Sequence, residues 1–244
     1  MTRLAVIADI HGNLLALEAV LADIERRGAD RIIDLGDCVS GPLWPRETAE
    51  RLEALQLPTV RGNHDRQLAE IPRTLMGASD GHAFDAVTPA QRERLGRLPA
   101  TLLIADGVLA FHGTPTTDTH YLLETIERGH LALASPGEIA ERLGAARAPV
   151  LLCGHSHQPR VIQGPAASLI VNPGSVGCPA YDDGNHVSET GSPLARYAIL
   201  TRDSNANWTA ELFAVVYDWA AASRRAAANG RPEWARALAT GFLR

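Results

Sequence analysis

The sequence predicts an α/β fold whose functional residues lie along one edge of the sheet. Short apolar runs alternate with amphipathic segments through residues 4–65, a pattern typical of strands that alternate with helices. The apolar runs are followed by glycine together with aspartate, asparagine or histidine, and functional residues of such folds gather beyond the carboxyl ends of strands. At 244 residues the chain can form a core without disulfides or a structural metal.

The first quarter of the chain predicts three strands and two helices. Leu4–Ala8 is a continuous apolar run, which favours a strand buried on both faces. Apolar residues then recur at helical spacing from Leu14 to Gly28, and the glycine is a plausible helix stop. We expect a second strand at 31–35, a helix at 46–56 and a third, short strand at 58–61.

The pattern is less regular in the middle of the chain. Thr88 and Gln91 form a capping-box pair that opens a helix extending to about Leu98. Strand-like runs at 101–105 and 108–111 flank Asp106-Gly107, which is a strong hairpin signal. The remaining expected elements are a helix at 138–143, strands at 149–153, 168–171, 197–201 and 208–216, and a surface loop at 182–195.

From residue 218 the chain becomes rich in alanine and arginine. Trp234, Leu238 and Phe242 recur at helical spacing, which predicts one apolar stripe on a short terminal helix. We therefore divide the chain into a main domain at 1–217 and a helical tail at 218–244 that packs on it. We predict that this tail docks close to the strand-end site and shapes access for the substrate.

Composition argues against several classes of function. The net charge of −5 disfavours a strongly basic nucleic-acid binder and hence a polynucleotide substrate. All 23 basic residues are arginine, so lysine Schiff-base chemistry and a P-loop lysine are excluded. Three cysteines without a CxxC pair, and no stretch like a signal peptide or membrane span, predict a cytoplasmic protein.

Five predicted strand ends carry residue types that bind metal ions. They contain Asp9 and His11, Asp37, Asn63 and His64, His112, and His155 and His157. Each segment alone is weak evidence for a metal site, because such residues also serve as helix caps or as hydrogen-bonded polar groups. This alternative is most plausible for His112. The ordered set is far more specific. Nitrogen and oxygen donors without thiolate favour Mn, Fe, Co, Ni or Zn over Ca.

The ordered motifs resemble those of the calcineurin-like metallophosphoesterase superfamily. They are D-x-H, G-D, G-N-H-D, H-G and G-H-x-H, and they span residues 9–157. The segments V-R-G-N-H-D at 60–65 and N-P-G-S-V-G at 172–177 are similar to sequences of a small bacterial and archaeal branch of this superfamily, which is phosphodiesterase-like. The resemblance implies a two-sheet β-sandwich flanked by helices.

The resemblance also implies a role for each residue. Asp9, His11, His157 and a bridging Asp37 would hold one divalent ion, and Asp37, Asn63, His112 and His155 the other. His64 would not be a ligand but would stabilise or protonate the leaving oxygen. A hydroxide that bridges the two ions would attack phosphorus in line.

One segment departs from the family pattern. Protein Ser/Thr phosphatases and symmetric dinucleoside tetraphosphate hydrolases carry an acid or amide and then arginine shortly after the bridging aspartate, where this chain has Ser40-Gly41. Phosphoproteins are therefore disfavoured against small phosphoesters and nucleotides, and the phosphate-clamping group is left open. Arg61 and Arg66 are the nearest candidates in sequence, and His120 and Tyr121 are candidates to line the pocket.

The favoured function is a di-metal phosphoester hydrolase. A non-catalytic metal-binding scaffold of the same fold and a nuclease stay open as alternatives. The complete ligand set speaks against the scaffold, and the negative net charge against the nuclease. The other histidines are expected to be solvated loop residues, although His120 is also a pocket candidate: His82, His120, His130 and His186.

Overall fold

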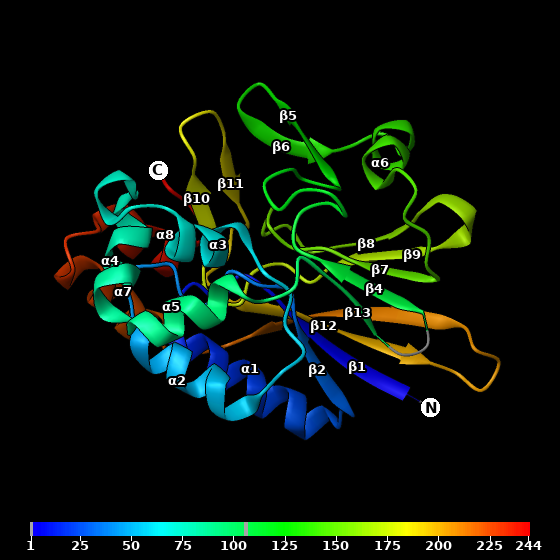
Figure 1. The fold of residues 1–244 in the computed structure, drawn as a ribbon, viewed down its shortest axis with the longest axis horizontal. Helices are drawn as coiled ribbons and strands as arrows, with labels where there is room; N and C mark the ends of the chain where they lie inside the picture. The colour runs from blue at the N-terminus through cyan, green and yellow to red at the C-terminus, as the bar shows by residue number, and fades with distance from the viewer. Residues whose placement is uncertain (1, 105–106) are drawn as a thin grey trace.

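Two β-sheets pack face to face in the computed structural model, which describes residues 2–104 and 107–244 (Figure 1). The first sheet has the order β13-β12-β1-β2 and consists of β1 (Thr2–Ile7), β2 (Arg31–Asp34), β12 (Ala195–Arg202) and β13 (Trp208–Val215). The second has the order β3-β4-β7-β9-β8 and consists of β3 (Thr101–Ile104), β4 (Val108–Phe111), β7 (Val150–Leu152), β8 (Arg160–Gln163) and β9 (Leu169–Asn172). The predicted α/β sandwich is thus confirmed.

A smaller third sheet and eight described helices surround this sandwich. The small sheet has the order β10-β11-β6-β5 and consists of β5 (Glu124–Glu127), β6 (His130–Leu133), β10 (Ala180–Asp182) and β11 (Val187–Glu189). The helices are α1 (Leu14–Arg27), α2 (Pro45–Leu55), α3 (Asn63–Glu70), α4 (Ala78–Ala86), α5 (Pro89–Gly96), α6 (Pro136–Leu143), α7 (Trp219–Ala228) and α8 (Pro232–Thr240). In Figure 1, helices α1 and α2 lie at the lower left, next to the first sheet, α7 lies at the left near α4, and α6 lies beside the second sheet.

Strand β1 shows why its sequence is continuously apolar. Leu4 and Val6 belong to the core between the two sheets, together with residues of β4 and β7. Ala5 and Ile7 belong to the core between the first sheet and α1. Since successive side chains of a strand point to opposite faces, a strand buried on both faces needs apolar residues at every position.

Two predicted helices begin and end where the sequence indicates. Gly28 ends α1 in the left-handed region, with φ of 73°. Thr88 caps α5 through the predicted reciprocal pair with Gln91. The predicted hairpin strands pair antiparallel over 101–104 and 108–111, whereas Ala105 of the predicted first strand and Asp106 of the predicted turn lie outside the described residues.

Two sequence predictions are wrong. The segment at 58–61 makes only an isolated bridge, between Thr59 and Asp34, before the chain turns at Gly62 into α3. The predicted loop at 182–195 contains β11, which pairs with β10 and buries His186 at 4% exposure. Thr59 pairs with an earlier strand, and β11 is a three-residue strand in a polar segment, so local apolar patterns reveal neither.

The C-terminal segment forms two helices that pack on the first sheet's helical layer. Ala222 and Ala226 of α7 and Leu238 of α8 are buried in the same core as α1. Phe242 lies beyond the end of α8 and is 45% exposed, so the predicted stripe is buried at Leu238 but not at Phe242.

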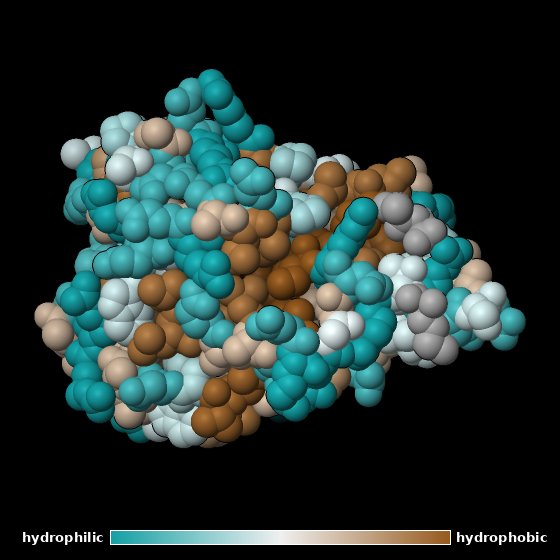
Figure 2. Space-filling view, turned by 90° about the horizontal axis from the view of Figure 1, so that it is seen from below, coloured by the Kyte–Doolittle hydropathy of each residue, from teal (hydrophilic) through white to brown (hydrophobic). Residues whose placement is uncertain are grey.

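The surface carries scattered apolar side chains. Viewed from below, hydrophobic side chains gather near the middle of the face, and hydrophilic ones border them (Figure 2). Large exposed apolar side chains come from separate elements, such as Leu103 on β3 and Leu133 on β6, as is usual for folded domains. None of the described helices is both long and apolar enough to cross a membrane.

Candidate metal centre

The carboxyl ends of four strands meet at one edge of the sandwich. Strands β1 and β2 run parallel in the first sheet, and β4 and β7 run parallel in the second. The loops that follow these strands carry Asp9, Asp37, His112 and His155. The topology therefore gathers residues from distant parts of the sequence, as the strand-end pattern predicts.

The backbone of these loops is held in an unusual conformation. Asp9, His11, Asp37, His155 and His157 all have positive φ, between 50° and 68°. They are five of the ten non-glycine residues in the described chain with this property. Left-handed backbone costs energy at such residues, and it concentrates where function fixes the geometry.

The N-P-G-S-V-G run locks the loop after β1 in place. The Ser175 hydroxyl and the Gly177 amide both donate to the Asp9 carbonyl, at 2.7 and 3.1 Å. A Cβ on Gly177 would lie 1.8 Å from the Ile10 carbonyl, so only glycine permits this approach.

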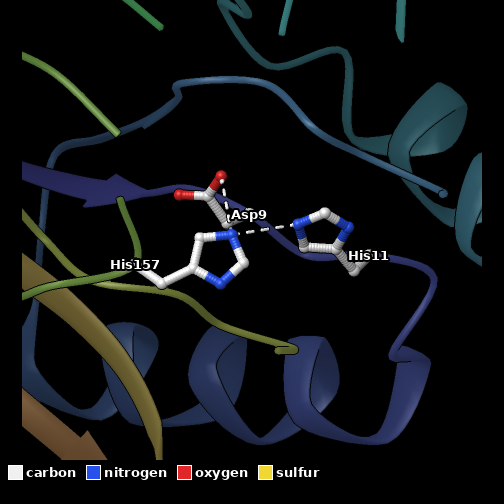
Figure 3. Close-up of side chains that lie close together, drawn as sticks. All are labelled: Asp9, His11 and His157. Carbon is white, nitrogen blue, oxygen red and sulfur yellow. Dashed lines mark hydrogen bonds and ion pairs between the residues drawn. The ribbon is translucent and has the colours of Figure 1, made fainter. Parts of the chain in front are cut away.

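The first group of candidate ligands consists of Asp9, His11 and His157 (Figure 3). The Nε2 atoms of His11 and His157 lie 3.1 Å apart, and His157 Nε2 lies 3.4 Å from Asp9 Oδ1. All three residues are buried. One donor atom from each falls within 4.8 Å of the others, which is a spacing that one metal ion can span.

The second group consists of Asp37, His112 and His155. His112 Nε2 lies 3.2 Å from both Asp37 Oδ2 and Asn63 Oδ1, which brings the Asn63 amide oxygen to this group. Asp37 Oδ2 also lies 3.9 Å from His11 Nε2 of the first group. Asp37 therefore stands between the two groups.

Backbone carbonyls fix the tautomer of three of these histidines. The Nδ1 atoms lie 2.7 Å from carbonyl oxygens of Ser40 for His11, Leu35 for His112 and Cys178 for His157. A carbonyl only accepts, so each Nδ1 carries hydrogen and donates. In the neutral ring, Nε2 then presents a lone pair to the site, as metal-binding histidines do.

These donors fit divalent metal ions. Two imidazole lone pairs 3.1 Å apart repel each other, and a cation bound between them would remove this repulsion. Asp9 Oδ1 is fully buried without a hydrogen-bond partner among the described residues. Burial of such a carboxylate is costly unless a cation compensates it.

The electrostatics of the site attract positive charge. Burial holds the pKa of His11 at about 4 and that of His155 at about 3, so both rings are neutral near pH 7, which is the form that binds metal. Burial also opposes the charged form of His112, but the Asp37 carboxylate outweighs it and raises that pKa to about 10. The same negative potential that draws a proton to His112 favours a metal cation.

His64 lies beside this centre and has partners of its own. Its Nδ1 lies 2.7 Å from Asp80 Oδ1, and the Ser40 hydroxyl donates to the same oxygen at 2.5 Å. Burial disfavours the charged ring, but the Asp37 and Asp80 carboxylates outweigh it and raise the pKa of His64 to about 9. Sequence reasoning missed Asp80, because it lies on α4, away from every motif.

The centre opens into a cavity of about 940 Å³. His120 and Tyr121, predicted to line the pocket, both border this cavity. The Tyr121 hydroxyl is hydrogen-bonded to His186 Nε2 at 2.8 Å, so His186 is a buried part of the wall rather than a solvated loop residue. No motif marked His186, and Asp183-x-x-His186 is a weak signal.

Arg61 and Arg66 line a different, smaller pocket of about 240 Å³ that also includes His112. Arg66 is engaged by both oxygens of Asp118, at 2.7 and 2.9 Å, and Arg61 donates to the Gly96 carbonyl. Residues of the C-terminal segment border the larger cavity instead. Among them are Trp234, which belongs to the apolar stripe that the sequence predicts, and Arg231, which the sequence did not single out.

A β-sandwich with two acid–imidazole groups at its strand ends defines a protein of the metallophosphoesterase class. The family model of the calcineurin-like phosphoesterase superfamily domain matches residues 2–192. The chain belongs to that superfamily.

Similar structures support this assignment. A metallophosphoesterase from Sphaerobacter thermophilus is 26% identical, with a TM-score of 0.75 over 99% of each chain. A hypothetical protein from Pyrococcus horikoshii has a TM-score of 0.78 over the whole of each chain at 20% identity. A structure titled a putative diadenosine tetraphosphatase is 21% identical, with a TM-score of 0.52 over 86% of this chain and 93% of that one.

A curated relative matches over a shorter stretch. An uncharacterized protein of Methanocaldococcus jannaschii is 48% identical over 64 residues, which are 26% of this chain and 26% of that protein.

Proposed function

We propose that the protein hydrolyses small phosphoesters with two divalent metal ions. One observation carries the proposal: three imidazole rings, fixed by backbone carbonyls, turn Nε2 toward two buried carboxylates. Asp9, His11, His157 and Asp37 would hold one ion, and Asp37, Asn63, His112 and His155 the other. When bound, two such ions supply Lewis-acid charge and lower the pKa of water.

His64 is proposed to act on the leaving oxygen. Asp80 holds its Nδ1, which leaves Nε2 on a ring that borders the cavity. With a pKa of about 9, the ring is protonated at neutral pH and can give its Nε2 proton to a departing alkoxide. His64 then works as a general acid and not as a metal ligand.

Small substrates fit the site better than phosphoproteins. Ser40-Gly41 lacks the residues that the protein phosphatase pattern has after the bridging aspartate. The cavity, at about 940 Å³, has room for a nucleotide-sized ligand. The structure titled a putative diadenosine tetraphosphatase shares the fold, so nucleotides belong in the substrate panel.

Other features accord with a cytoplasmic enzyme made of a main domain and a tail. Cys38, Cys153 and Cys178 are free and buried, as suits a reducing compartment. We propose residues 1–217 as the metal-binding domain and residues 218–244 as a segment that shapes its cavity. We propose manganese as the first ion to test, alongside nickel, cobalt, zinc and magnesium.

The test is a panel of phosphomonoesters, phosphodiesters and nucleotides assayed with each metal. His64→Ala should keep both ions by elemental analysis and lose about 10²–10⁴-fold in kcat, because a general acid acts only in the transition state. Asp37→Ala should lose metal, because Asp37 would serve both ions.

Three outcomes would contradict the proposal. Equal metal loss in the two variants would make His64 a ligand. A protein that binds two ions but hydrolyses nothing in the panel would be a scaffold, and activity confined to polynucleotides would make it a nuclease.

A further inference from the structure

The start of α8 packs directly against the candidate metal centre. The Trp234 ring lies 6.0 Å from the His11 ring, edge to face. A Cβ on Gly41 would meet the Trp234 ring at 3.3 Å and the His11 carbonyl at 2.3 Å. The absence of a side chain at Gly41 thus leaves space that the Trp234 ring of the C-terminal segment occupies.

Arg231 precedes α8 and is brought to the same cavity. Its Nη1 donates to the Ser79 hydroxyl at 3.1 Å. Ser79 is followed by Asp80, the residue that holds His64. Consecutive residues of α4 therefore place the guanidinium of Arg231 and the imidazole of His64 on one wall.

The guanidinium of Arg231 has capacity left for a ligand. It uses Nε on Glu233 and one N–H of Nη1 on Ser79, so three of its five N–H donors have no partner among the described residues. Its side chain is only 20% exposed. Its positive charge acts on a neighbouring group: the pKa of His82 is lowered by burial and, to a smaller extent, by the charges of Arg225 and Arg231.

The other arginines that border the cavity are less suited to a ligand. Arg142 donates to the carbonyls of Leu122 and Glu124 and also contacts Glu138, so its donors face the protein. Arg244 also borders the cavity, but no hydrogen bond or ion pair positions its guanidinium among the described residues. Arg231 is held at two edges and open at the third.

We propose that Arg231 forms an anion subsite that binds a phosphate oxygen and makes the site prefer esters with two negative charges. This inference rests on the proposed function. A guanidinium attracts a phosphomonoester dianion more strongly than a diester monoanion, and it can bind two oxygens at once. The substrate class that follows is phosphomonoesters, including nucleotides with a terminal phosphate.

The test compares p-nitrophenyl phosphate, a dianion, with bis(p-nitrophenyl) phosphate, a monoanion, in the metal-loaded protein. Arg231→Ala should lower kcat/KM for the monoester about 10- to 100-fold and for the diester by less than about threefold. In the same variant, the inhibition constant of inorganic phosphate should rise by a factor similar to the loss in kcat/KM for the monoester. Arg236→Ala, an exposed arginine on α8, is the matched control and should change neither.

A variant of the neighbouring acid, Glu233, should change monoester hydrolysis and phosphate inhibition in the opposite direction. Glu233 borders the same cavity and repels an anion, so Glu233→Gln should improve phosphate inhibition and monoester kcat/KM by about two- to fivefold. A merely structural role for Arg231 would not produce opposite changes in the two variants. If Arg231→Ala folds poorly, Arg231→Gln keeps part of the aliphatic stem and a polar end without the charge, and should show the same monoester loss.

Equal loss for monoester and diester, or no loss beyond that of Arg236→Ala, would overturn the subsite. If the unchanged protein hydrolyses neither ester, the proposed function fails instead. Phosphate binding measured by calorimetry then still tests Arg231, and equal affinity in Arg231→Ala and the unchanged protein would overturn it.

Discussion

His64 is positioned by side chains that lie outside the motif that carries it. Asp80 and Ser40 contact its ring, and they come from α4 and from the loop after the bridging aspartate. The sequence predicted His64 because G-N-H-D is a dense local pattern. Asp80 follows it by 16 residues on a separate helix, with no spacing that links the two.

Asp80→Asn should impair catalysis and shift its pH dependence. The Asp80 carboxylate helps to raise the pKa of His64 to about 9. A general acid must be protonated, so the rate falls as pH rises through this pKa. Without the carboxylate, the falling limb of the pH–kcat profile should move to lower pH and kcat at pH 8 should drop about 10- to 100-fold.

Ser40→Ala is the milder control, because it leaves the carboxylate in place. An unchanged falling limb in Asp80→Asn would show that Asp80 does not act through His64.

Asp34 provides a separate test through stability. It lies at the end of β2, and burial raises its pKa to about 8. The folded protein therefore holds a proton that the unfolded chain releases above its ordinary pKa of 3.8. The stabilising contribution is complete below pH 3.8 and is lost progressively as pH rises towards 8.

The side chain of Asp34→Asn cannot ionise, so the loss of stability with rising pH that Asp34 causes should disappear. At pH 8 the variant should be more stable than the parent by about 1–3 kcal/mol, with a smaller difference at pH 5. Denaturant unfolding at both pH values measures it. Asp203→Asn is a control of opposite sign, because the Asn207 amide lowers the pKa of exposed Asp203. A stability difference that does not grow with pH would contradict the argument.

At the scale of elements, local signals predicted those with periodicity or caps. α1 and α5 carry an apolar stripe or a capping box, and β1 carries a continuous apolar run. β11 has only three residues and pairs with the nearby β10 and the distant β6, so its short polar sequence does not show where it lies. α3 begins within the G-N-H-D motif, whose residues are candidate site residues and do not form the apolar pattern of a helix.

Two substitutions on α8 should separate access from stability. Trp234→Ala removes a cavity wall next to His11, so we expect a change of about two- to tenfold in KM with metal content unchanged. Leu238→Ala opens a cavity in the core and should cost about 2–5 kcal/mol with KM unchanged.

This pair is a cleaner test of the tail than deletion of residues 218–244. Deletion would also expose the core that α7 and α8 share with α1. Unaltered KM values in Trp234→Ala across the ester panel would make α8 a stability element alone.

At the scale of the molecule, the candidate ligands come from both sheets. Asp9 and Asp37 follow strands of the first sheet, and His112 and His157 follow strands of the second. The sequence predicted this assembly through the resemblance rather than through pairing rules. Strand β1 lies between β2 and β12, and no local pattern shows that residue 4 pairs with residue 200.

Removal of metal should lower the melting temperature. A ligand at 100 times its Kd stabilises a protein by about 2.7 kcal/mol, and 1 kcal/mol shifts Tm by about 2–4 °C in a chain of this size. We therefore expect a loss of about 5–10 °C for each ion on treatment with chelator. His157→Ala should lose part of this metal-dependent increment, and the exposed His130→Ala none. If chelator leaves the Tm of the unchanged protein as it was, the expectation of two bound ions is contradicted.

The hydrogen bonds from the 172–178 segment impose an order on assembly during synthesis. The Asp9 carbonyl is held by Ser175 and Gly177, and His157 by the Cys178 carbonyl. Asp9 and Asp37 leave the ribosome long before these partners exist. A nascent chain therefore carries Asp9 before the segment that holds its loop has been made, so we expect the complete set of candidate ligands to assemble only after residue 178 has been synthesised.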